Sequence, residues 1–206
     1  MTPRTRPDSA AARPADRPLR ADARRNRARI LAAAEAAFAA KGPSASTEEI
    51  AQGAEVAIGT VFRHFPTKEA LIEAVFVERL GRLADEAREL RTAADPGAAF
   101  VAFFAEAVGQ SIAKHAFAGA AGNAVPDLAV TEGPIAGAVR DLRQALATLL
   151  SRAQHAGAIR RDVDMASLIA LMIGASRAAE HAGADARVRD LAMTMIVDGL
   201  RPPARH

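Results

Sequence analysis

Apolar residues recur every three or four positions along most of the chain, which places them on one face of an α-helix. The first such stripe predicts a helix from about Arg24 to Lys41, with inward residues Ile30, Ala33, Ala34, Ala37 and Phe38. A longer stripe predicts a helix from Lys68 to about Arg91, with apolar residues Leu71, Ile72, Val75, Phe76, Leu80, Leu83, Ala87 and Leu90. A helix of that length can join two parts of a molecule.

Four further helices follow from the same periodicity. Their expected ranges are 98–117, 135 to about 155, 165–182 and about 185–200, with a small, flexible loop at 118–127. Gly157 is suited to end the second of these helices, and Asp162 or Asp164 can cap the third. The third helix is apolar on nearly every side, so it must be buried on more than one side.

The composition favours an all-α protein with a sizeable core. Half of the 206 residues are hydrophobic, and alanine dominates that half while aromatic residues make up only 4%. Such a composition suits close-packed helices better than a sheet. The absence of cysteine excludes disulfides and thiolate metal sites and is compatible with a cytoplasmic location. We expect no membrane segment, because Arg177 and Glu180 interrupt the most apolar helix.

Two short helices at a sharp angle are predicted just before the long helix. Ser46 and Glu49 have the spacing of a capping box, in which a hydroxyl and a carboxylate reciprocally satisfy backbone N–H groups at a helix start. The segment 53–57 is too poor in apolar periodicity to continue that helix, and a second short helix follows at 58–64. A phenylalanine–proline pair ends it, and Thr67 can cap the long helix. Helix, turn and helix within about twenty residues have the dimensions of a DNA-reading helix-turn-helix.

The segment IAQGAEVAIGTVFRHFPTKEAL at 50–71 resembles the DNA-binding segment of TetR-family transcriptional repressors. The family pattern runs approximately I-A-x-x-A-G-V-S-x-G-T-L-Y-x-H-F-x-S-K-E-x-L, and the match needs no gap. In this chain Glu55 stands where the family usually has glycine, Ala57 where it usually has a serine cap, and Phe62 where it usually has tyrosine. The DNA sequence that this chain prefers therefore cannot be inferred from the sites of other family members.

The resemblance implies a domain order and a mode of action. The expected parts are a disordered basic arm at 1–22, a helix-turn-helix DNA-binding domain at 23–67, a helical ligand-binding and dimerisation domain at 68–200, and a tail at 201–206. The expected partners are a double-stranded DNA operator, a second copy of the chain and a largely apolar small-molecule effector. The helix that begins at Lys68 corresponds to the family's lever, which moves when the ligand binds.

The second short helix, expected at 58–64, is the reading helix, which would enter the DNA groove and supply most of the expected contacts. In a major groove, Thr60 is the best candidate for a base edge, Gly59 lets the backbone approach closely, and Ile58 can touch a thymine methyl group. Other positions match family residues that usually contact phosphates, and these contacts fix orientation without reading sequence. The predicted DNA-binding set is Ser46, Ala57, Ile58, Gly59, Thr60, Phe62, Arg63, His64 and Lys68.

Charge is distributed unevenly along the chain. Through Lys41 there are ten basic and four acidic side chains, a balance of +6, whereas the remaining 17 basic and 20 acidic residues give −3. Such asymmetry fits a basic end that meets phosphates and a body with another role. Residues 1–22 are rich in proline, alanine and arginine, and either reach DNA as a basic arm or serve as a solubilising tail.

Two sets of apolar residues in the body are candidates for binding. A phenylalanine stripe and its neighbours either line an apolar ligand pocket or fill the core, and this set is Phe100, Phe103, Phe104, His115, Phe117 and Met172. The small residues of the all-round apolar helix permit close approach of a second subunit. The GAIRRDVD segment at 157–164 and the helices after it also resemble the family's dimerisation region. The candidate interface is Leu168, Leu171, Ala175, Ala178, Leu191 and Met195.

Catalytic and metal-dependent functions find little support in the sequence. No HExxH, EF-hand, phosphate-binding loop or nucleophile-elbow pattern accompanies the five histidines, so we expect neither a metal nor a cofactor. The prediction is an all-α DNA-binding transcriptional regulator, released from its operator by a ligand. The alternative is a helical carrier or small-molecule binding protein that has lost DNA reading.

Overall fold

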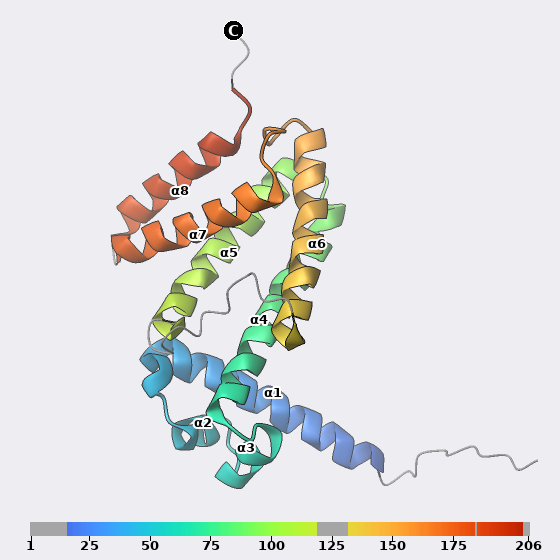
Figure 1. The fold of residues 1–206 in the computed structure, drawn as a ribbon, viewed down its shortest axis with the longest axis vertical. Coiled ribbons are helices and arrows are strands. Elements are labelled where there is room, and N and C mark those ends of the chain that lie inside the picture. Colours follow the sequence, from blue (N-terminus) through green and yellow to red (C-terminus); the bar gives the residue numbers. More distant parts are fainter. Residues whose placement is uncertain (1–15, 119–131, 184, 204–206) are drawn as a thin grey trace, which may run out of the picture.

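The structure is a computed structural model that describes residues 16–118, 132–183 and 185–203. In these residues it contains eight α-helices and two short 3-10 helices, which confirms the all-α prediction. The α-helices are α1 (Asp16–Lys41), α2 (Thr47–Gly53), α3 (Ile58–His64), α4 (Lys68–Glu89), α5 (Pro96–Ala118), α6 (Gly133–His155), α7 (Met165–Ala182) and α8 (Ala186–Leu200), and the 3-10 helices are η1 (Gly42–Ser44) and η2 (Leu90–Thr92) (Figure 1). No helix of the described residues is long and apolar enough to cross a bilayer.

Helices α1 to α3 form a small unit at the foot of the molecule, with α1 lying across it and α2 and α3 beneath (Figure 1). Its core brings together apolar side chains from all three helices, and Ile30, Phe38, Ile50 and Val61 are each at most 1% exposed. The first turns of α4 complete this core through Leu71 and Val75. The unit is therefore built on the start of the long helix.

Helix α1 begins earlier than the periodicity predicts. It starts at Asp16, so the prediction of a disordered segment is wrong for residues 16–22, while 1–15 lie outside the described residues. Alanine and arginine are among the best helix formers and carry the helix back towards its start. Pro18 is tolerated because the first turn of a helix has no intrahelical use for its backbone N–H groups.

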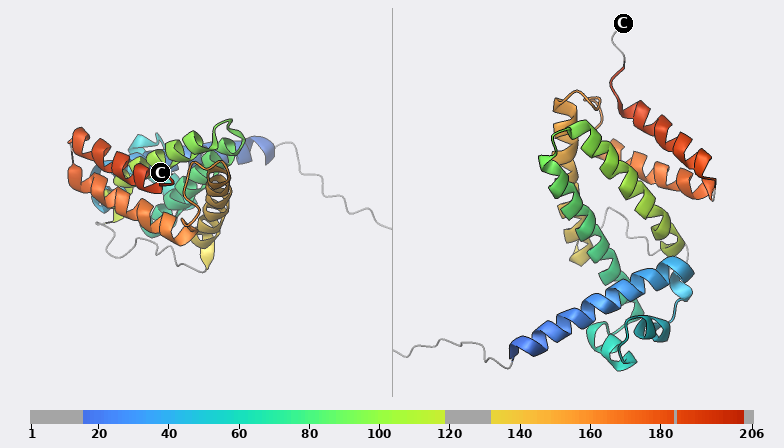
Figure 2. Two further views of the ribbon diagram at one scale, coloured as in Figure 1. Left: turned by 90° about the horizontal axis from the view of Figure 1, so that it is seen from above. Right: turned by 180° about the vertical axis from the view of Figure 1, so that it is seen from behind.

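The body is made by α4 to α8. Helix α4 rises from the foot and packs along α6, while α7 crosses α5 and pairs with α8 (Figures 1 and 2). The main core contains the fully buried side chains of Phe100, Phe103, Phe104, Leu149 and Leu168. Helix α4 contributes side chains to the cores of both the foot and the body, so a movement of this helix would change the packing of both.

The helix ends agree with the capping residues that the sequence indicated. The side chain of Thr67 accepts a hydrogen bond from the backbone of Ala70 at the start of α4, and Asp164 accepts one from Ser167 at the start of α7. Gly157 follows the end of α6 with a φ of 73°. That left-handed conformation costs glycine little, which explains why the helix ends there.

Candidate nucleic-acid interface and internal cavity

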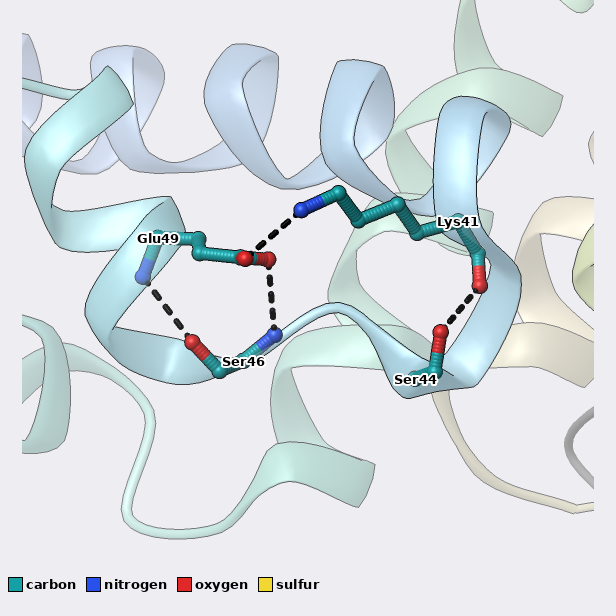
Figure 3. A network of polar contacts seen from close by, with 4 residues as sticks. All are labelled: Lys41, Ser44, Ser46 and Glu49. Carbon is teal, nitrogen blue, oxygen red and sulfur yellow. Dashed lines mark hydrogen bonds and ion pairs between the residues drawn. The ribbon is translucent and has the colours of Figure 1, made fainter.

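A capping box fixes the start of α2 relative to the end of α1. The backbone N–H of Glu49 donates to Ser46 Oγ at 3.1 Å, and the backbone N–H of Ser46 donates to Glu49 Oε2 at 3.3 Å. Lys41 Nζ donates to Glu49 Oε1 at 2.7 Å, and the Ser44 hydroxyl donates to the Lys41 carbonyl oxygen (Figure 3). The Lys41 hydrogen bond and then the Ser46 backbone hydrogen bond lower the pKa of Glu49, so the carboxylate stays ionised at neutral pH.

The turn between α2 and α3 carries a non-glycine residue in the left-handed region. Glu55 has a φ of 53°, while the backbone N–H of Val56 donates to the Ala51 carbonyl oxygen at 3.0 Å and closes the turn. Ala57 occupies the N-cap of α3 and makes no side-chain capping bond. The turn thus forms without the glycine and serine that are usual in the resembled family, at the cost of backbone strain and one missing cap.

Helix α3 holds one face in the core and presents the other to solvent at the foot of the molecule (Figure 1). Val61 and Phe65 face inward, and the Arg27 guanidinium lies 5.4 Å from the centre of the Phe65 ring. On the outer face Ile58 is 37% and Phe62 is 47% exposed. Two large exposed apolar side chains on a short helix mark a surface that is suited to contact a partner.

The remaining predicted DNA-binding residues lie on or beside this outer face. Ala57, Gly59 and Arg63 are exposed, and a Cβ at Gly59 would meet no atom within 4 Å. Ser46, Thr60, His64 and Lys68 are half-buried, and Ser46 serves as the α2 cap. Packing within the chain would therefore allow a larger residue than glycine at position 59.

Comparison with known proteins identifies the family. Residues 95–202, more than half of the chain, match the domain described as transcriptional regulator SbtR-like, C-terminal domain, and residues 30–75 match the family described as bacterial regulatory proteins, tetR family. The chain belongs to the TetR family. The second match contains α2 and α3, and the chain is therefore a DNA-binding transcriptional regulator with a helix-turn-helix. Members of this family are regulators and not enzymes.

Solved structures support the assignment to the TetR family. A TetR transcription regulatory protein from Mycobacterium vanbaalenii is 39% identical, with a TM-score of 0.71 over 90% of this chain and 100% of that one. A TetR transcriptional regulator from Streptomyces coelicolor is 32% identical, with a TM-score of 0.70 over 86% of this chain and 99% of that one. FadR from Bacillus subtilis, in complex with stearoyl-CoA, is 17% identical over 86% of this chain and 98% of that one, and shares the fold with a TM-score of 0.58. No curated protein sequence matches the chain.

A cavity of about 110 Å³ lies between α4, α6 and α7 in the body of this TetR-family protein. Its lining is mostly apolar, and the polar side chains that reach it are Arg79, Arg143 and Ser176. The Ser176 hydroxyl donates to the Met172 carbonyl oxygen at 2.8 Å, so its proton is already used. The apolar lining residues are Phe76, Leu80, Leu83, Ala107, Val139, Leu142, Leu146, Ile169, Met172 and Ile173.

The predicted pocket set and this cavity share only Met172 among the described side chains. Phe100, Phe103 and Phe104 are each 1% exposed and fill the main core instead. The side chains of His115 and Phe117 lie outside the described residues. Sequence reasoning missed Arg79, although its place one turn from apolar stripe residues on the long helix was a usable signal.

An ion pair joins the long helix to α1 close to the cavity. Arg82 Nη2 donates to both carboxylate oxygens of Glu35, at 2.6 and 2.7 Å. Arg79 lies one turn before Arg82, and burial lowers its pKa while the Glu35 charge opposes that effect. An arginine stays protonated even so, which leaves a positive charge at the cavity wall.

The candidate dimerisation residues divide between the core and the surface. Leu168 and Ala175 are buried within the protomer, and Leu171 is half-buried against the core. Ala178 is exposed, and Leu191 and Met195 are 54% and 67% exposed. Ile173 and Val188, which sequence reasoning did not select, are also large exposed apolar residues of α7 and α8. These two helices lie side by side at the edge of the body (Figure 2).

Proposed function

We propose that this TetR-family regulator is a homodimeric repressor that a small molecule releases from its operator. The observation that carries the DNA half of the proposal is the outer face of α3, where exposed residues project from a core-anchored helix at the tip of the foot. The cavity beside α4 supports the effector half, because its wall belongs to the helix that also completes the core of the foot.

The proposed contacts divide into base-reading and phosphate-binding residues. Thr60, Gly59 and Ile58 face base edges in the major groove, while Lys68 and Ser46 bind phosphate oxygens. Ser46 accepts the capping bond through its lone pairs, so its hydroxyl proton remains available to a phosphate. Two reading helices of a dimer would occupy half-sites about one helical turn, roughly 34 Å, apart, or farther apart where two dimers bind one operator.

The proposed dimer interface is the apolar face formed by Ile173 on α7 and by Val188, Leu191 and Met195 on α8. Large apolar side chains left exposed on two neighbouring helices support the proposal that a partner covers this surface. A second copy is the proposed cover, because a twofold pairing lets one patch complement itself and sets the two α3 helices in a fixed relation.

Sedimentation of a matched pair of variants tests this interface. Met195→Lys places a charge in the apolar face and should give monomers at concentrations where the parent is dimeric. Asp190→Lys changes an exposed residue on another side of α8 and should leave the dimer intact. A monomeric parent, or a fully dimeric Met195→Lys variant, would rule out the interface.

The proposed switch uses α4 as a lever between the cavity and the foot. An effector shifts the protein between its DNA-binding and released forms only if it binds one of them more tightly. Phe76 and Leu80 lie at the cavity wall, whereas Leu71 and Val75, about one turn earlier, belong to the core of the foot. A change of packing at the cavity therefore reaches α3 through a continuous helix.

DNA binding is tested with an operator selected from random sequences and with single alanine variants. Thr60→Ala should lower affinity in a way that depends on the bases present, by roughly tenfold at the contacted position. Lys68→Ala should lower affinity equally for all sequences and reduce the slope of log affinity against log salt by about one. Thr148→Ala, at an exposed position on α6, is the matched control and should behave as the parent. If no sequence is enriched, or if the Thr60→Ala and Lys68→Ala variants both bind as the parent does, the proposed reading surface is wrong.

A further inference from the structure

The cavity between α4, α6 and α7 places a cation among apolar side chains. Arg79 is half-buried in its wall, one turn away from Phe76 and Leu83 on the same helix. Arg143 also lines the cavity but is exposed, and the proton of Ser176 is committed to the backbone. Of the two arginines that line the cavity, Arg79 is therefore the one that is shielded from solvent and would meet a ligand inside the cavity.

The charge of Arg79 is only partly compensated within the chain. Among the described residues, Glu35 is the acidic group whose charge acts on it, and Arg82 already holds both oxygens of that carboxylate. Burying a cation without a full partner is costly, and an entering anion would recover part of that cost. A guanidinium presents its N–H groups in a planar fork that matches the two oxygens of a carboxylate.

The volume limits the apolar part of the ligand. A dry cavity of about 150 Å³ accepts benzene, and this one measures about 110 Å³ and is partly open to solvent. Because this space is smaller but partly open, a ring or an alkyl chain can enter it in part, and the remainder would extend outward. A single buried cation favours one negative charge over the two of a phosphate monoester.

We propose that this cavity binds a hydrophobic monocarboxylic acid, with the carboxylate on Arg79 and the ring or alkyl chain among the apolar side chains of α4, α6 and α7. The inference rests on the proposed function, because it names the chemical class of the effector. It also specifies a route to the foot. The bound carboxylate adds a negative charge beside Arg79 and repels Glu35, which weakens the electrostatic attachment of α1 to α4.

Isothermal titration calorimetry on the full chain tests the proposal with acids and their uncharged alcohols as probes. The chain has no Trp and no Tyr, so a calorimetric signal replaces intrinsic fluorescence. Benzoate and octanoate should each bind at least tenfold more tightly than benzyl alcohol and octanol. Arg79→Met should remove this preference by weakening the acids and leaving the alcohols unchanged, while Arg79→Lys should keep part of it. Arg88→Met, at an exposed position outside the cavity on the same helix, is the control and should bind as the parent.

The possible results separate this inference from the proposed function. Alcohols that bind as tightly as the acids, an unchanged acid affinity in a folded Arg79→Met variant, or no binding of either acid at millimolar concentration would overturn the inference. A mobility shift with the selected operator is measured in parallel. Operator binding without any acid binding would reject the proposed carboxylate site but not the proposed function as a DNA-binding regulator. Acid binding through Arg79 without any operator binding supports the carboxylate site and rejects the proposed function.

Discussion

Replacing Glu55 by glycine should stabilise the protein, although glycine weakens most helices and strands. Glu55 has a φ of 53°, where the Cβ of an L-residue lies too close to its own backbone. Relief of this strain is worth about 1–2 kcal/mol. Glycine also gives the unfolded chain more freedom, which offsets about 0.4–1 kcal/mol of the gain. The exposed ion pair between Arg29 Nη1 and Glu55 Oε2, 3.9 Å apart, contributes little stability, so its loss in the variant costs little.

The expected net effect is a gain of about 0.5 kcal/mol in the free energy of unfolding. The same chemical change at Glu78, an exposed residue in the middle of α4, provides the control. There glycine replaces a good helix former and should cost about 0.8–1 kcal/mol. The two variants should therefore lie on opposite sides of the parent, about 1.5 kcal/mol apart.

Urea unfolding followed by far-ultraviolet circular dichroism measures both variants. All proteins are compared at one chain concentration, because association would make apparent stability depend on concentration. The slope of free energy against urea should stay constant, which ensures that midpoints report stability. A Glu55→Gly variant that loses as much stability as Glu78→Gly would show that the left-handed turn residue is not strained, and the reasoning would be refuted.

Two further predictions concern packing and charge in the body. Gly97→Ala should destabilise the protein by about 1–3 kcal/mol, because the new Cβ would lie 2.4 Å from Ala158 Cβ. Gly109→Ala on the same helix is the control, because its new Cβ would meet no atom within 4 Å. In thermal unfolding this control should be neutral or stabilising. Burial and then the Glu106 charge raise the pKa of Glu86 above its ordinary value of 4.5. Its ionisation therefore favours the unfolded state, and the folded protein loses stability as pH rises through the raised pKa. Glu86→Gln should raise the melting temperature at pH values above that pKa, and this gain should disappear below pH 4.5, where the carboxyl is neutral in both states. A gain of the same size below pH 4.5 would contradict the cause.

Local sequence signals were sufficient to predict the helices of the helix-turn-helix. The capping box of Ser46 and Glu49 depends on residues three positions apart, and the structure confirms it together with α3 at Ile58–His64. These features are decided within one helical turn, so no distant contact is needed to predict them. The roles of individual residues in DNA contact remain predictions.

The sequence alone determined the all-α class, most helix ends and the resemblance to the TetR family, because periodicity, caps and motif spacing are properties of neighbouring residues. Tertiary structure decided which apolar faces became core, cavity or surface. Phe100, Phe103 and Phe104 have the same helical spacing whether they line a pocket or fill a core, and only the packing of α5 within the body places them in the core. Arg79 likewise lies on an amphipathic helix, and its position at the cavity wall depends on where α6 and α7 come to rest against α4. Those distances join residues far apart in the chain, which no local pattern encodes.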